Sequence, residues 1–119
     1  MKNIILLIAV MVVSAYATTS TVKSVTGAYE HKRGEDTFRM VFLENGISER
    51  YANGKKEEKE GKWKISEEGE LHITDSDGNI MFFRINKDRS ITDIAYELED
   101  ERERVDLPKE KQITVKKIK

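Results

Sequence analysis

Turn signals recur along this chain about every 8 to 12 residues, and this spacing constrains the fold more than any other feature. Two of them are Asn-Gly pairs, Asn45-Gly46 and Asn53-Gly54, whose residues tolerate the positive φ angles of a tight hairpin turn. The remaining turn signals are Arg33-Gly34, Glu67-Glu68-Gly69, Asp77-Gly78, Asn86-Lys87-Asp88 and Glu99-Asp100. Short segments between such turns are typical of an antiparallel β domain.

The segments between the turns are rich in β-branched and aromatic residues, and their apolar residues alternate with a period of two. No segment after residue 17 shows a helical period. We therefore predict an all-β domain over residues 25–119, an antiparallel up-and-down meander of about eight strands that forms a small barrel or half-barrel. Strands are expected over residues 25–31, 37–44, 47–52, 63–65, 71–73, 80–85, 91–98, 102–107 and 112–118, with 80–85 the most buried.

The Asn-Gly turns also predict how the second and third strands pair. A two-residue turn at Asn45-Gly46 would place Ile47 and Tyr51 on the core face that carries Phe38, Met40 and Phe42.

A two-residue turn at Asn53-Gly54 would pair Ala52 with Lys55 and Arg50 with Glu57. If the alternation of this register continues along the chain, Trp63 lies on the face opposite Tyr51, away from the core. We therefore expect a β-bulge at Gly61 that returns Trp63 to the core. The charged run 55–60 becomes a solvated extension of the hairpin.

The first 17 residues have the pattern of a secretory signal. Lys2 is followed by an unbroken run of ten apolar residues, Ile4–Val13, and by the small-residue site Ala15-Tyr16-Ala17. This run is shorter than the roughly 20 residues that a membrane-spanning helix needs. We expect cleavage after Ala17, export to the periplasm or beyond, and no stable membrane span; the alternative is an uncleaved N-terminal anchor. Residues 18–24 would form a flexible N-terminal arm.

The composition after residue 17 limits the chemistry. The remaining 102 residues contain 20 basic, 22 acidic and 31 apolar side chains, so the core is small. High charge with few apolar residues also fits disorder, but the near-zero net charge and the regular alternation favour a folded domain. The absence of cysteine excludes disulfides, thiol catalysis and zinc–thiolate sites. A near-neutral charge gives no general attraction for nucleic acid.

Few residues suggest a chemical site. His31 and His72 lie on separate expected strands, do not form a metal-ligand cluster, and are expected to be exposed. The segment 75–79 has the acidic start of a calcium loop but lacks the later ligands, so a hairpin is favoured. No carboxylate stands in a markedly apolar setting, and no nucleophile motif is present. We therefore expect a monomeric non-enzyme without metal or cofactor, whose partner is a protein or a small apolar ligand.

Eight aromatic residues follow residue 17, and most must belong to the core. If the sheet closes into a barrel, some of them could instead line a cup for an apolar ligand. The candidate lining residues are Phe42, Tyr51, Trp63, Phe82 and Tyr96.

Two resemblances carry further expectations. Gly27-Ala28-Tyr29 opens the first strand where lipocalins have G-x-W, with Tyr29 in place of the tryptophan. Together with the segments 43–46, 53–55 and 61–65, it makes the chain similar to small exported bacterial lipocalin-like β-barrel proteins. This resemblance implies a barrel that serves as a binding module.

The second resemblance is to the small exported β-barrel inhibitors of bacterial metalloproteases. Trp63, Asp77-Gly78 and Phe82-Phe83 follow the order of elements in that family, although its disulfide is missing here. The resemblance implies that a free N-terminal segment enters a protease cleft, a role that would fall to Thr18, Thr19, Ser20, Thr21 and Val22. A binding protein for an unknown partner, a protease inhibitor and an apolar-ligand carrier thus remain as hypotheses.

Overall fold

The computed structural model describes residues 25–119, which form ten strands and one short 3₁₀ helix. The predicted signal segment, its cleavage site and the N-terminal arm lie outside these residues. The elements are β1 (Gly27–Arg33), β2 (Asp36–Phe42), β3 (Ile47–Ala52), β4 (Lys55–Lys56), β5 (Gly61–Ile65), β6 (Leu71–Thr74), β7 (Ile80–Ile85), β8 (Ile91–Glu97), β9 (Arg104–Asp106), η1 (Lys109–Lys111) and β10 (Thr114–Lys117).

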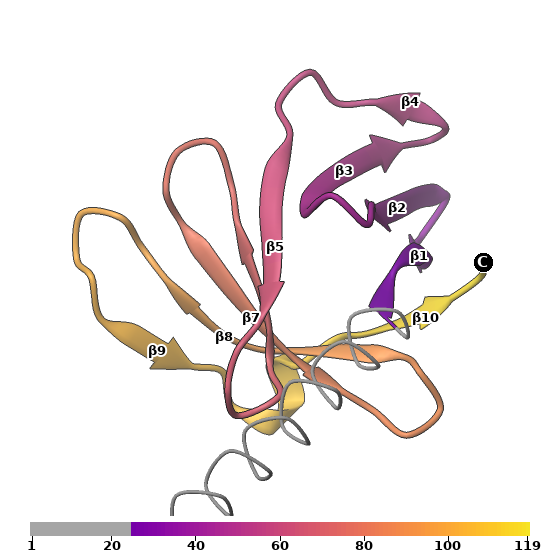
Figure 1. Cartoon of the computed structure of the whole chain (residues 1–119). Helices are drawn as coiled ribbons and strands as arrows, with labels where there is room; N and C mark the ends of the chain where they lie inside the picture. The colour runs from indigo at the N-terminus through magenta and orange to yellow at the C-terminus, as the bar shows by residue number, and fades with distance from the viewer. Residues whose placement is uncertain (1–24) are drawn as a thin grey trace, which may run out of the picture.

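The strands close into an eight-stranded antiparallel barrel, which confirms the all-β prediction (Figure 1). Each strand from β1 to β8 pairs with the next, except that β5 takes the place after β3. The strand β10 then pairs with both β8 and β1 and closes the ring. The strand β4 only extends the β3 hairpin, and β9 pairs with the end of β8 that β10 does not reach.

Three aromatic rings form the centre of the core. The ring centroids of Tyr29 and Phe42 are 5.3 Å apart, and those of Phe42 and Trp63 are 5.9 Å apart. The polar atoms of these rings are satisfied, because Trp63 Nε1 donates to the Leu43 carbonyl at 2.8 Å and the Tyr29 hydroxyl donates to the Val25 carbonyl at 2.7 Å. Burial raises the pKa of Tyr29 to about 12. The cluster also contains Leu71, Ile73, Phe83, Ile91 and Val115.

Four hairpin loops share one conformation. In the loop after β2, the Leu43 N–H donates to the Ile47 carbonyl at 2.9 Å, and three residues, 44–46, lie between them. The last of these three residues has a positive φ, which is the geometry of a three-residue hairpin loop. The same hydrogen-bond pattern recurs in the loops 66–70, 75–79 and 86–90, where the positive φ belongs to Gly69, Gly78 and Arg89.

The three-residue loop at 44–46 exchanges the inward and outward faces of β3 relative to the prediction. Phe42 pairs with Ser48 and Met40 pairs with Arg50, so Ser48 and Arg50 share the core face of β2. The expectation that Ile47 and Tyr51 lie on that face is therefore wrong. One extra loop residue shifts the register by one, and a shift by one exchanges the two faces of a strand.

The second Asn-Gly turn has the predicted two residues. Asn53 and Gly54 have φ angles of 51° and 80°, and Ala52 pairs with Lys55. The following charged run is mostly exposed, as expected, and forms ion pairs of its own. Lys56 Nζ lies 2.9 Å from carboxylate oxygens of both Glu49 and Glu60.

Trp63 reaches the core as predicted, with 7% of its surface exposed, but not through a one-residue bulge. The Glu57 N–H donates to the Arg50 carbonyl, and the ladder resumes where Ser48 pairs with Gly61. Arg50 and Ser48 are two positions apart on β3, whereas their partners Glu57 and Gly61 are four positions apart, so the difference is an even number. An even difference leaves the order of inward and outward side chains unchanged. Trp63 therefore points inward because the three-residue loop at 44–46 had already exchanged the two faces of β3.

The shared loop conformation predicts two opposite effects on stability. Gly69→Ala should lower the free energy of unfolding by about 1 kcal/mol, because a side chain strains a residue at positive φ. No atom outside the neighbouring residues lies within 4 Å of the position that the new Cβ would occupy, so a steric clash does not contribute. Arg89→Gly should raise the free energy of unfolding by a similar amount. Urea denaturation of both variants measures this, and a stabilising Gly69→Ala would contradict the loop assignment.

Candidate functional site

A cavity of about 320 Å³ opens beside the aromatic core. Its wall comes from β1, β2, β3, β7, β8 and the segment around β10, together with Glu57 after β4, and not from the short strands β5 and β6. Phe38 and Ile113 lie at its edge and are 40% and 43% exposed, so the cavity is open to solvent there. The lining residues are His31, Phe38, Arg39, Met40, Arg50, Tyr51, Glu57, Met81, Phe83, Asp93, Ile113 and Val115.

Most of this wall is apolar. Met40, Met81, Phe83 and Val115 contribute side chains from three strands, β2, β7 and β10, and Met40 and Met81 pack directly against the core cluster. A mainly apolar cavity with a few polar groups is the usual form of a small-molecule site, and this volume is at the lower end of the common range of roughly 300–1,000 Å³.

Asp93 is the unusual residue of the wall. It pairs in register with the buried Phe83 on β7, and its N–H donates to the Ile113 carbonyl at 2.9 Å. Its Oδ1 is buried and has no hydrogen-bond partner among residues 25–119. Burial raises the pKa of the Asp93 carboxyl above its ordinary value, because the charged form loses solvation without gaining a partner.

The other charged groups of the wall are paired. Arg50 Nε lies 3.0 Å from Glu57 Oε2, and Arg39 Nη2 lies 3.2 Å from Glu30 Oε2. His31 is half-buried beside Phe38, its partner in the β1–β2 register. The cavity therefore combines a mainly apolar wall, two paired arginines and one carboxylate, that of Asp93, without a counter-charge in the described part of the chain.

These contacts correct two premises of the sequence analysis. The statement that no carboxylate stands in an apolar setting is wrong for Asp93. The irregularity between Phe82 and Phe83, which pair with Ala95 and Asp93, leaves Ile94 as an extra residue in β8 and turns Asp93 inward. The expectation that both histidines are exposed is also wrong, because His31 lines the cavity and His72 is packed against Phe82.

Only one of the five candidate lining residues lies at this cavity. Tyr51 contributes to the wall, whereas Phe42 and Trp63 pack together in the closed core. Tyr96 is 36% exposed near the end of β8 and pairs with Met81. Phe82 belongs to the outer surface of the barrel.

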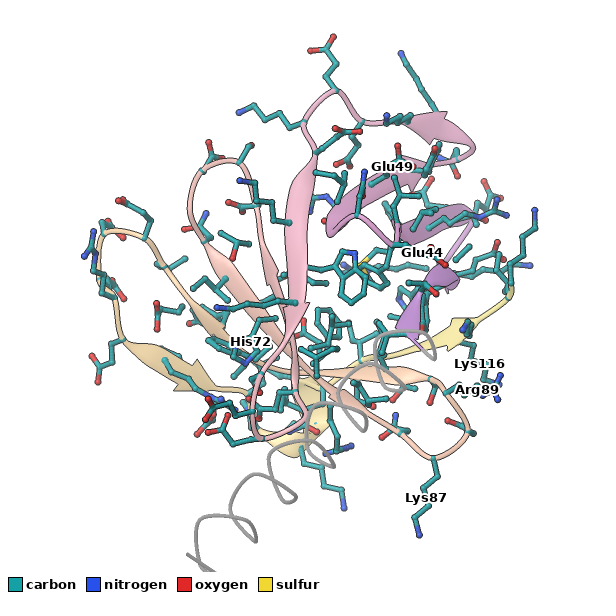
Figure 2. All side chains as sticks on the ribbon, viewed as in Figure 1. Glu44, Glu49, His72, Lys87, Arg89 and Lys116 are labelled. Atoms are coloured by element: carbon teal, nitrogen blue, oxygen red, sulfur yellow. The ribbon has the colours of Figure 1, made fainter. Side chains whose placement is uncertain are left out.

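Phe82 is covered by a polar cluster on that outer surface. Arg104 Cζ lies 4.6 Å from the Phe82 ring centroid, and its two terminal nitrogens donate to the carboxylate of Glu70 at 2.9 and 3.1 Å. His72 contacts the same ring edge-on, with centroids 4.5 Å apart. Figure 2 shows His72 and Glu49 on different sides of the barrel, so this cluster is separate from the β3–β4 ion pairs. The paired Arg104 lowers the pKa of Glu70, and the cluster ties β9 to β6.

Comparisons of the chain with protein-family profiles, curated proteins and solved structures found no match. Among residues 25–119, no three potential metal ligands converge. No helix in this range is long and apolar enough to cross a membrane. The cavity therefore has to be interpreted from its own geometry.

The unpaired carboxylate predicts a stabilising substitution. Asp93→Leu should raise the free energy of unfolding by about 1 kcal/mol at neutral pH, a value near the low end for a buried unpaired acceptor because solvent still screens the half-buried residue. A raised pKa means that folding favours protonated Asp93, so the wild type loses relative stability as the pH rises through that pKa. The gain from the variant should therefore be larger at about pH 8 than at about pH 4.

Urea denaturation of both proteins at the two pH values measures this difference. Asp100→Leu, at an exposed aspartate in the turn after β8, serves as the control for a general effect of removing an acidic group. An Asp93→Leu variant that is less stable than the wild type at both pH values would contradict the assignment of an unpaired buried carboxylate.

Proposed function

We propose that this chain is an exported, non-enzymatic binding protein that holds a small, mainly apolar ligand in its barrel cavity. The observation that carries this proposal is the open cavity of about 320 Å³ beside a fully packed core. A barrel with a cup of this kind would act as a reduced lipocalin-like protein. The predicted signal segment supplies the argument for export.

The polar groups of the wall favour binding over catalysis. Within residues 25–119, neither His31 nor the Asp93 carboxylate hydrogen-bonds to another side chain of the cavity, so these two do not form a nucleophile–base pair. Arg50 and Glu57 neutralise each other at the side of the cavity. The protease-inhibitor hypothesis depends on residues 18–22, which lie outside the described part of the chain, and no contact of the barrel favours it.

A neutral fluorescent probe, N-phenyl-1-naphthylamine, tests whether the cavity takes up apolar molecules. The wild type should enhance its fluorescence with a dissociation constant on the order of micromolar. Ile113→Trp should weaken this binding about tenfold or more, because the larger ring fills the open edge of the cavity while remaining partly solvated.

The chain provides a matched control for this substitution. Ile118 is exposed to the same extent as Ile113, 43%, lies just beyond the other end of β10, and does not line the cavity. Ile118→Trp should bind the probe like the wild type, and both variants should keep the wild-type urea midpoint. Equal binding by Ile113→Trp and the wild type, or no binding by the wild type, would overturn the proposal.

A further inference from the structure

We infer that the cavity selects small ligands that carry a protonated amine on an apolar body, and that Asp93 binds the ammonium group. This inference rests on the proposed binding function and adds the chemical class of the ligand. It depends on the position and surroundings of Asp93, the one acidic group of the cavity wall that has no counter-charge among residues 25–119.

The immediate surroundings of Asp93 are apolar. The strand β7 places Phe83 beside it in register, and the segment entering β10 places Ile113 on its other side. Met81 and Val115 continue the same wall. Among residues 25–119 the Asp93 Oδ1 has no hydrogen-bond donor, so a ligand that brings a donor to this carboxylate would remove the cost of leaving it unpaired.

Charge decides which donor is favoured. The remaining titratable or charged groups of the wall are His31 on β1, Arg39 on β2, Arg50 and Tyr51 on β3, and Glu57 after β4. Both guanidinium groups have carboxylate partners, so neither is available to compensate Asp93. A cationic donor gains a charge-assisted hydrogen bond to the carboxylate, whereas a hydroxyl gains a neutral one and an anion is repelled.

The apolar wall limits the rest of the ligand. A linear or compact hydrocarbon of modest size can lie against Met40, Met81 and Phe83 while its head group reaches Asp93. The two methionines adapt to different shapes, because their side chains are unbranched and polarisable. The head group should therefore be selected more strictly than the body.

Three probes with the same chain and different head groups test this inference: n-octylamine, 1-octanol and octanoate. Each is titrated against bound N-phenyl-1-naphthylamine, and its dissociation constant is taken from the displacement. The wild type should bind n-octylamine about tenfold or more tightly than 1-octanol, and octanoate most weakly. Asp93→Asn should bind n-octylamine and 1-octanol equally, and Asp100→Asn, at an exposed turn, should behave as the wild type.

The pH dependence provides a second readout. An alkylammonium favours the ionised carboxylate, so the affinity for n-octylamine should rise with pH through the titration of Asp93, while that for 1-octanol stays level. Asp93→Asn should abolish this rise. His31→Gln, which removes the histidine of the cavity wall and leaves Asp93 in place, is the control and should retain the rise.

The outcomes separate the two proposals. If the wild type does not bind the fluorescent probe, the binding function itself is wrong. If it binds 1-octanol as tightly as n-octylamine, or if Asp93→Asn keeps the preference for the amine, the cavity binds apolar ligands but the inference about Asp93 is overturned.

Discussion

The loop between β2 and β3 contains three residues, and this odd number determines which face of β3 points into the barrel. With Phe42 opposite Ser48, the inward positions of β3 are held by Ser48 and Arg50 rather than by Ile47 and Tyr51. Large apolar side chains are thereby removed from one wall of the barrel interior. The ion pair between Arg50 and Glu57, the inward Trp63 and the open space next to Met40 all depend on this register.

The cavity follows from a small core in a closed barrel. An eight-stranded barrel has an interior that side chains can just fill or that can hold one small ligand. Here Tyr29, Phe42 and Trp63 pack tightly in one region, and β5 and β6 do not contribute to the wall of the other. A small number of apolar residues leaves few to spare for the wall of an empty cavity. In the structure these apolar residues are concentrated around the aromatic core, so that part of the barrel interior is densely packed and the part beside it is open.

The strand pattern and the turns could be predicted from the sequence because they depend on local chemistry. Alternation located the strands, and Asn53-Gly54 correctly predicted a two-residue turn. The face of β3 could not be predicted in this way, since an Asn-Gly pair fits both a two-residue turn and the end of a three-residue loop. The environment of Asp93 was missed for a related reason. Its inward position requires the extra residue Ile94 in β8, and alternation alone counts Ile94, Tyr96 and Leu98 on one face and places Asp93 on the other.

Under the proposed binding function, Asp93 would also link stability to ligand binding. A buried acceptor without a partner lowers the stability of the empty barrel, and a chain with so few apolar residues has little stability to spare. The same desolvation that penalises the free carboxylate strengthens its interaction with a cation inside the cavity, because fewer water molecules compete for it. A ligand that pairs with Asp93 would therefore stabilise the fold by more than contact with the apolar wall alone provides. In the proposed amine-bound barrel, each charged group of the cavity wall would have a partner, and the empty barrel would be the less favourable state.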